Sequence, residues 1–300
     1  MKTAKYWNEQ YNLGNNISEM MREDNNIDHN SQEVIEMAYE LQSGSYIKGM
    51  QNEKVKEHKY NYSKELSEVI KNLSNTQSIL EVGIGEGTTL CGVMQNFDTS
   101  VDFYGFDLSF SRVSYARKWL NSLSLNNVTL STGEFSNIPF LDNSIDIVYT
   151  SHSIEPNRGK EEEILKELYR ITKKYLILLE PAYELTNDKN KKRMDEHKYC
   201  KDLANIARKL GYKVIKHELF KYHVNDANPT AIIIIEKDIQ KKIIHTSPFA
   251  CPLTKTPIIK KADCYYSEER MSIYPLINEI GCLRIENAIL ATRYEELTKK

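Results

Sequence analysis

The chain has 300 residues, with 40 Lys and Arg against 42 Asp and Glu, and a formal net charge of −2. This length allows one large domain with smaller parts, and the near-neutral charge gives no reason to expect capture of nucleic acid. The longest aliphatic run, residues 231–235, is far too short to span a bilayer, and the polar N-terminus has no signal-peptide pattern. Five cysteines in this length do not indicate a disulfide scaffold, so we expect a cytoplasmic protein without a membrane partner.

The first 74 residues are polar and are predicted to form a helical cap. Apolar residues recur at helical spacing over residues 32–41, and a second helical pattern covers residues 62–73. Between them, residues 44–49 contain two glycines and are interpreted as a hinge or a substrate loop. The predicted domains are therefore a cap at 1–74, a core at 75–237 and a small C-terminal domain at 238–300.

The most informative stretch, residues 79–90, reads I-L-E-V-G-I-G-E-G-T-T-L. A short apolar run carries a carboxylate at Glu81, and three glycines then alternate at Gly83, Gly85 and Gly87. This pattern predicts a strand, a tight loop and a helix, the first crossover of an open parallel sheet. Because glycine lets the backbone turn sharply and approach a ligand, we expect a nucleotide-type cofactor here. A tight turn with no ligand is the alternative that the spacing alone leaves open.

Strands and helices alternate through the rest of the core. Further strands are predicted at 103–107, 128–131, 145–150, 175–180, 213–220 and 231–237, with helices at 111–122, 160–172 and 201–210. Asp107 ends the second strand, 20 residues past Gly87, where a carboxylate suits the hydroxyls of a ribose. The alternative for Asp107 is a helix N-cap. Glu134 follows the third strand, and its alternative is a solvated loop carboxylate.

Residues 137–149, N-I-P-F-L-D-N-S-I-D-I-V-Y, complete a series that resembles the class I S-adenosylmethionine-dependent methyltransferases. That family shows E-x-G-x-G-x-G, an acidic end to the second strand, and P-F-x-D-x-S-F-D-x-V, and the likeness covers about residues 75–237. The resemblance implies an α/β, Rossmann-like seven-stranded sheet in the order 3-2-1-4-5-7-6, with only strand 7 antiparallel. It also implies S-adenosylmethionine as the cofactor and S-adenosylhomocysteine as its product, and no metal is expected.

The resemblance assigns roles to residues of the predicted cofactor site. The glycine loop would line the methionine part, Asp107 would hold the ribose diol, and Glu134 would lie near the adenine amine. The whole predicted cofactor site comprises Glu81, Gly83, Gly85, Gly87, Asp107, Leu108, Glu134, Phe135 and Ser151. The opening Tyr6–Tyr11 also resembles a family segment that packs beside the cofactor, with simple docking on the core as the alternative.

The residues after the fourth strand are predicted to face the methyl acceptor. His152 is the predicted general base, because the unperturbed pKa of a histidine, about 6.5, suits neutral pH. Glu155 and Asn157 are predicted to orient an acceptor hydroxyl, with helix capping as the alternative. An ordinary hydrogen-bonded loop histidine is the alternative for His152. The predicted catalytic residues are thus His152 and Glu155, and the predicted substrate-binding residues are Asn157, Glu180, Tyr183, Arg193 and His197.

The C-terminal sequence resembles the small zinc-ribbon-like domain that activates tRNA, rRNA and protein methyltransferases. Each C-x-x-C pair of that domain has lost its second cysteine here, which leaves Cys251 and Cys264 at ligand positions. The nearest further ligands are Cys282 and His245. Because a structural zinc ion needs four thiolate or imidazole ligands, we expect a degenerate, metal-free ribbon.

The predicted function is methylation of a small polar molecule, most simply at oxygen, with a sugar or nucleotide sugar as the suggested acceptor. Methylation of RNA or protein, with the ribbon used for recognition, is the alternative enzyme. A third hypothesis is a non-catalytic scaffold that binds the cofactor. The intact glycines, Asp107 and Glu134 argue against it.

Overall fold

A computed structural model describes residues 2–223, 225–238 and 247–298. His245, named above as a spare ligand, lies outside these residues. Within the part of the chain that the structure describes, none of the helices combines the length and apolar character that a bilayer span requires.

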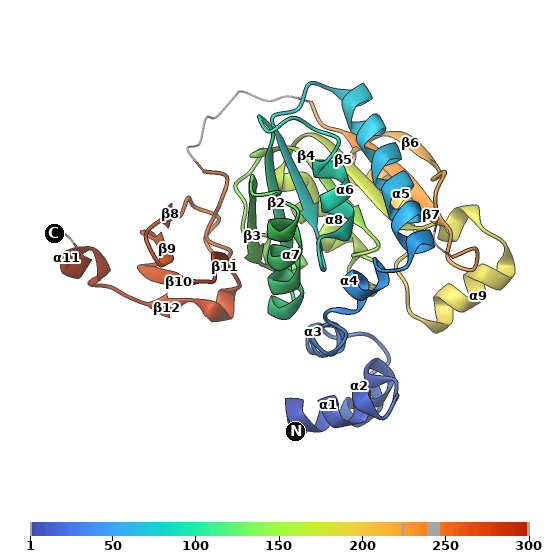
Figure 1. The fold of residues 1–300 in the computed structure, drawn as a ribbon, viewed down its shortest axis with the longest axis horizontal. Coiled ribbons are helices and arrows are strands. Elements are labelled where there is room, and N and C mark those ends of the chain that lie inside the picture. Colours follow the sequence, from blue (N-terminus) through green and yellow to red (C-terminus); the bar gives the residue numbers. More distant parts are fainter. Residues whose placement is uncertain (1, 224, 239–246, 299–300) are drawn as a thin grey trace.

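The core is a mostly parallel sheet in the predicted order β3-β2-β1-β4-β5-β7-β6 (Figure 1). The strands are β1 (Ser78–Val82), β2 (Asp102–Asp107), β3 (Val128–Thr132), β4 (Ile145–Ser151), β5 (Thr172–Pro181), β6 (Lys213–Leu219) and β7 (Thr230–Glu236). Strand β7 pairs antiparallel with both β5 and β6, and β1 to β5 pair in parallel. The predicted fold class is therefore confirmed, including the single reversed strand.

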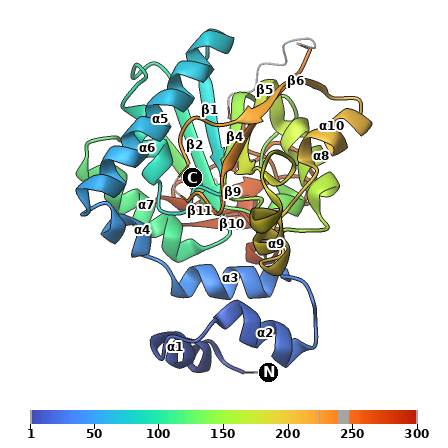
Figure 2. The same cartoon turned by 90° about the vertical axis from the view of Figure 1, so that its right-hand side faces the viewer.

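Two helical layers cover the sheet. Figure 2 shows α5 (Glu53–Leu73), α6 (Thr88–Met94) and α7 (Phe110–Ser122) on one face and α8 (Glu161–Ile171) and α10 (Leu203–Lys209) on the other. Strand β7 reads as a continuous apolar run because its side chains are buried on both faces, Ile233 and Ile235 in one cluster and Ile232 and Ile234 in the other.

The N-terminal cap lies across the carboxyl end of the sheet (Figures 1 and 2). It contains α1 (Ala4–Asn12), α2 (Ile17–Asn25), α3 (Gln32–Leu41) and α4 (Ser45–Gly49). Residues 45–49, part of the segment interpreted as a hinge or a substrate loop, form the short helix α4 rather than a loop, with Gly44 as N-cap at φ +91°. Trp7 is buried against Ile17, Met21 and Val34 in a cluster of the cap itself, so this tryptophan docks within the cap.

Two carboxylates, buried Glu86 and half-buried Glu40, attach the cap to the core. Glu86, inside the glycine loop, accepts the backbone N–H groups of Gly44 at 2.9 Å and Ile47 at 2.7 Å. These are orphan donors at the start of α4, so Glu86 caps that helix from a distance. Glu40 of α3 accepts the Ser109 hydroxyl at 2.8 Å and the Ser111 N–H at 3.1 Å at the start of α7.

The polar insertion after β5 contains a 3₁₀ turn (Tyr183–Leu185) and α9 (Asp188–Glu196). The charged run at residues 189–193 belongs to this helix. Asn190 and Met194 are buried on its inner face. A further 3₁₀ turn (Phe135–Asn137) follows β3.

Residues 247–298, here called the C-terminal β unit, continue the central sheet. The unit contains β8 (Ile259–Lys260), β9 (Cys264–Ser267), β10 (Ser272–Ile277), β11 (Ile280–Cys282), a 3₁₀ turn (Ile285–Asn287), β12 (Ile289–Leu290) and α11 (Tyr294–Thr298). Strand β11 pairs in parallel with β3, with Gly281 beside Ser131 and Cys282 beside Thr132. The unit therefore covers the edge that β3 would otherwise expose (Figure 1).

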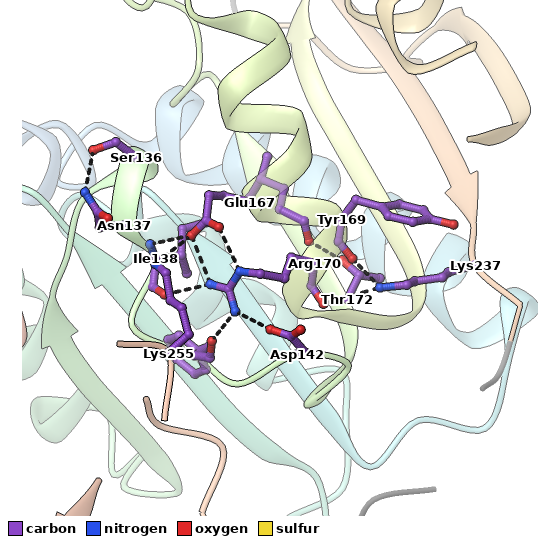
Figure 3. Close-up of polar contacts among 12 residues, drawn as sticks. Ser136, Asn137, Ile138, Asp142, Glu167, Tyr169, Arg170, Thr172, Lys237 and Lys255 are labelled. Atoms are coloured by element: carbon purple, nitrogen blue, oxygen red, sulfur yellow. Dashed lines mark hydrogen bonds and ion pairs between the residues drawn. The ribbon is translucent and has the colours of Figure 1, made fainter. Parts of the chain in front are cut away.

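A polar network ties the C-terminal β unit to α8 (Figure 3). The Glu167 carboxylate accepts the Ile138 N–H at 3.0 Å, the Arg170 guanidinium at 2.8 Å and the Lys255 ammonium at 3.0 Å. Burial alone would raise the pKa of Glu167, but Arg170 and Lys255 hold it below its ordinary value. Arg170 also donates to the Phe140 carbonyl at 2.7 Å, so the loop before β4 is held by the same network.

The cysteines at the former ligand positions bond to tyrosines. Cys251 Sγ lies 3.2 Å from the Tyr274 hydroxyl, and Cys264 Sγ lies 3.1 Å from the Tyr294 hydroxyl. All five cysteines are free, buried thiols. Among the described residues, no group of three or more His, Cys, Asp or Glu side chains is placed to hold a metal ion.

Candidate functional site

A cavity of about 670 Å³ opens at the carboxyl ends of β1, β2 and β4, beneath the cap. This is the edge at which ligands bind in open α/β sheets. The sheet end contributes Glu81, Gly83, Gly85, Asp107, Leu108, Glu134, Phe135, Ser151, His152, Glu155 and Asn157 to its wall, and the cap and α5 contribute Gln32, Tyr39, Tyr46, His58, Lys59 and Tyr62.

The glycines of the loop have two different surroundings, the cavity and the contact between two helices. Gly83 and Gly85 line the cavity with φ values of +74° and +54°. Gly87 also has a positive φ but does not line the cavity. A Cβ there would lie 3.2 Å from the Ala116 side chain, so Gly87 lets α6 pack against α7. Gly87 thus has a helix-packing role, and its contact with the cofactor stays a prediction.

We expect Gly83→Ala to destabilise the fold more than Gly159→Ala. Both glycines have positive φ, which costs an alanine about 1–2 kcal/mol. A Cβ on Gly83 would lie 2.2 Å from the Ser153 Cβ, whereas a Cβ on Gly159 meets nothing within 4 Å. Overpacking adds about 1–3 kcal/mol at Gly83 alone. Urea unfolding of the two variants measures the difference, and equal losses of unfolding free energy would contradict the steric argument.

Asp107 connects the glycine loop to the start of α7. It is 8% exposed, and its carboxylate accepts the Gly85 N–H at 2.8 Å and the Ser109 N–H at 2.9 Å. Burial raises the pKa of Asp107, while these N–H groups and nearby Arg112 oppose the rise. The N-cap alternative for Asp107 is wrong, because Ser109 is the N-cap and its hydroxyl accepts the Arg112 N–H at 3.1 Å.

Glu134 is held by the cap as well as by its own turn. Its carboxylate accepts the Gln32 amide of α3 at 2.6 Å and the Asn137 amide at 3.0 Å. The alternative of a freely solvated carboxylate is therefore wrong. Phe135 is half-buried against the core and also lines the cavity.

An acidic and a basic side chain, buried Glu81 and half-buried Lys59, both line the cavity. The Glu81 carboxylate accepts the Tyr149 hydroxyl at 3.0 Å, and the Lys59 ammonium donates to the Thr89 hydroxyl at 3.0 Å. Burial raises the pKa of Glu81 and lowers the pKa of Lys59, so each charge is costly there without an opposite partner. Sequence reasoning missed Lys59. Its signal is a lysine in line with the buried stripe Tyr62, Leu66 and Ile70 of α5.

His152 is fixed by hydrogen bonds on both sides of its ring. Its Nδ1 lies 2.7 Å from a Glu155 oxygen, and its Nε2 lies 2.7 Å from the Thr230 hydroxyl. The backbone of His152 has φ +53°, in the left-handed region. Glu155 also accepts the Asn228 amide at 3.2 Å. Burial would raise the pKa of Glu155, but the bonds from its neighbours, led by His152, hold it below its ordinary value.

Four predicted substrate-binding residues lie outside the residues that line this cavity. Glu180 is fully buried and accepts the N–H groups of Ser153 and Ile154, and burial raises its pKa to about 7. Tyr183 donates to Asp195 at 2.9 Å, and Arg193 and His197 pack on the Tyr199 ring. Of the predicted set, Asn157 lines the cavity. Thr230 and Asn228 were missed, because their sequence signal was only a turn before β7.

Comparison with known proteins agrees with this geometry. Residues 79–175 match the family model described as a methyltransferase domain. A chain in the complex between the Haloferax volcanii Trm112 methyltransferase activator and a methyltransferase is 15% identical, with a TM-score of 0.50, covering 65% of this chain and 94% of that chain. A SAM-dependent methyltransferase from Aquifex aeolicus is 24% identical, with a TM-score of 0.45, covering 56% of this chain and 87% of that one.

A third structure, magnesium protoporphyrin IX methyltransferase from Synechocystis PCC 6803 with bound S-adenosylhomocysteine, is 14% identical, with a TM-score of 0.48, covering 60% and 84% of the two chains. The matched model identifies a methyltransferase domain, and the Haloferax volcanii complex contains a chain of similar fold. The protein is an S-adenosylmethionine-dependent methyltransferase, with residues 79–175 as the matched part of its methyltransferase domain.

Proposed function

We propose that the enzyme methylates a hydroxyl group of a small polar molecule, such as a sugar or nucleotide sugar. The observation that carries this proposal is the polar wall beyond the glycine loop, where Thr230, His152 and Glu155 form a hydrogen-bonded row. Two further atoms of residues that line the cavity, Asn228 Oδ1 and His58 Nε2, are buried and have no hydrogen-bond partner in the described part of the chain. Such atoms favour an acceptor that brings its own polar groups.

The shape of the site also favours a small acceptor. The cap closes the carboxyl edge of the sheet through the bonds of Glu86, Glu40 and Gln32 described above. A long polymer would have to lie outside the cap, whereas a small molecule fits beneath it. Bound S-adenosylmethionine supplies a methyl group already activated on a sulfonium sulfur, so the chain mainly has to align the acceptor and remove its proton.

The residues present fit the cofactor. Gly85 lines the cavity, and a Cβ added there would lie 3.5 Å from Arg112 and 3.9 Å from the Tyr46 ring. Because glycine has no side chain, that space is left for a ligand. An α-amino acid end carries one charge of each sign, as do Glu81 and Lys59 at the inner wall. We infer that Lys59 faces the cofactor carboxylate and that Glu81 lies on the side of its ammonium. Asp107 and Glu134 then serve the ribose and the adenine.

Lys59→Met should weaken binding of S-adenosylhomocysteine by about 10- to 100-fold, since a hydrogen bond to a charged group contributes about 1.5–3 kcal/mol. Binding of 5′-methylthioadenosine, which lacks the amino acid end, should stay unchanged. Calorimetry with both ligands measures the contrast, and Lys64→Met, exposed on the same helix, is the matched control. Equal losses for both ligands would remove Lys59 from the carboxylate site.

The alternative is methylation of RNA or protein, with the C-terminal β unit as a recognition module related to the methyltransferase activators. This alternative predicts salt-dependent RNA binding. Incubation with methyl-labelled cofactor and separate fractions of small metabolites, RNA and protein decides between the two. Label in the metabolite fraction, on oxygen, supports our proposal, and label confined to RNA or protein contradicts it.

A further inference from the structure

Thr230 lies where the cavity meets the ring of His152. It begins β7, it is 1% exposed, and it lines the cavity together with His152, Glu155 and Asn228. Its hydroxyl is 2.7 Å from His152 Nε2. Both nitrogens of His152 are therefore engaged within the chain, and a proton leaving a ligand reaches that ring through Thr230.

The direction of each hydrogen bond follows from the chemistry of the row. An ionised Glu155 only accepts, so His152 Nδ1 carries the hydrogen of the 2.7 Å bond between them. In a neutral imidazole Nε2 is then the acceptor, and the Thr230 hydroxyl must be its donor. The Thr230 oxygen retains a lone pair for a donor in the cavity.

A second polar atom, Asn228 Oδ1, also favours a ligand in this part of the cavity. The Asn228 amide nitrogen donates to Glu155 at 3.2 Å, which fixes the orientation of the amide because a carboxylate cannot donate. Asn228 Oδ1 is left buried without a partner among the residues that the structure describes, and Asn228 lines the cavity. An unmade bond at a buried acceptor is costly, so a ligand that donates there is favoured.

We propose that Thr230 is a catalytic residue, whose hydroxyl takes the proton of the acceptor hydroxyl while it passes its own proton to His152. This inference rests on the proposed O-methylation. In the balanced step, the oxygen–methyl bond forms and the sulfur–methyl bond breaks, with its electron pair left on sulfur. The acceptor proton moves to Thr230 Oγ, the Thr230 proton moves to His152 Nε2, and Glu155 stabilises the resulting imidazolium.

The test compares Thr230→Val, Thr230→Ser and Thr172→Val with the intact enzyme, using the first hydroxylated metabolite that accepts labelled methyl. Thr230→Val keeps the side-chain shape without the hydroxyl, and we expect kcat to fall about 10²–10⁴-fold. KM and the affinity for S-adenosylhomocysteine should stay nearly constant, and serine should restore most of kcat. Thr172, also buried and bonded to the Leu168 carbonyl at 2.7 Å, controls for the loss of an internal hydrogen bond.

A second measurement needs no acceptor. In the ¹⁵N spectrum of histidine-labelled protein, His152 is assigned by the signals lost in His152→Asn. We expect Nδ1 to carry the hydrogen and Nε2 to be unprotonated. A hydrogen on Nε2 would overturn the relay, because Thr230 would then have no proton to give to that nitrogen.

The outcomes separate the relay from the proposed function. If the label is on oxygen and Thr230→Val behaves like Thr172→Val, with lower stability and intact kcat, the relay is wrong and O-methylation stands. If the label is found on nitrogen, on sulfur or in a macromolecule, the proposed function fails and the relay fails with it.

Discussion

A chain that ends at residue 238 is expected to unfold or aggregate under conditions in which the intact protein is stable. The C-terminal β unit shares one core with the sheet, because Phe249, Tyr265 and Tyr274 belong to the same buried cluster as Phe140. The Phe140 and Phe249 rings are 4.8 Å apart. Each large apolar side chain exposed by truncation loses about 1.5–3 kcal/mol, and several such losses approach the 5–15 kcal/mol that typically separates folded from unfolded domains.

Thermal melting and size-exclusion chromatography of the truncated chain measure this effect. A point variant provides a milder version: Tyr274→Ala, at a fully buried position, should cost about 3–5 kcal/mol, as for other large aromatic truncations. Ile289→Ala, at a side chain that is 53% exposed in the same unit, should be nearly neutral. A truncated chain that melts at the same temperature and keeps full activity would show that the unit is dispensable.

Asp107→Ala is expected to weaken binding of S-adenosylhomocysteine by more than 100-fold. The carboxylate already orders the glycine loop through Gly85 and Ser109, and we propose that its remaining lone pairs accept the ribose hydroxyls. Two charge-assisted bonds to the cofactor at about 1.5–3 kcal/mol each give a loss of about 3–6 kcal/mol. Isothermal calorimetry measures the affinity, and circular dichroism checks that the variant is folded.

The matched control for that experiment is Asp102→Ala, at the other, exposed end of strand β2. This change should leave the affinity unaltered, because Asp102 is remote from the carboxyl edge of the sheet. An Asp107→Ala protein that binds as tightly as the intact enzyme would remove Asp107 from the cofactor site.

The strands of the sheet could be predicted because their signals are local, whereas the order of the strands was implied by the resemblance to the methyltransferase family. Continuous apolar runs such as Ala231 to Ile235 mark strands buried on both faces, and α8 shows the helical spacing of a one-sided helix. The alternating glycines at 83 and 85 mark a loop with positive φ, which side chains rarely adopt. Where the sequence lacked such signals, helices were not predicted: residues 188–196 form α9, and residues 45–49 form α4.

Some of the residues predicted for the acceptor side line the cavity, and others do not. His152, Glu155 and Asn157 do line the cavity, since the end of β4 must lie at the carboxyl edge. Tyr183, Arg193 and His197 were chosen from a polar insertion that follows β5 at that same edge. Position in the chain did not show that their side chains turn to Asp195 and Tyr199 instead.

Local patterns were sufficient to predict the strands of the core and the glycine loop, because each depends on residues within one short segment. The class of enzyme and the order of the sheet were predicted from the resemblance of the whole motif series to a known family. The contacts between side chains that are distant in the sequence became visible in the folded protein. Thr230 reaches His152 across 78 positions, and Arg284 of the C-terminal β unit pairs with Glu36 of the cap across 248. Such contacts depend on how layers pack rather than on local pattern, so Lys59, Thr230 and the pairing of β11 with β3 emerged only from the fold.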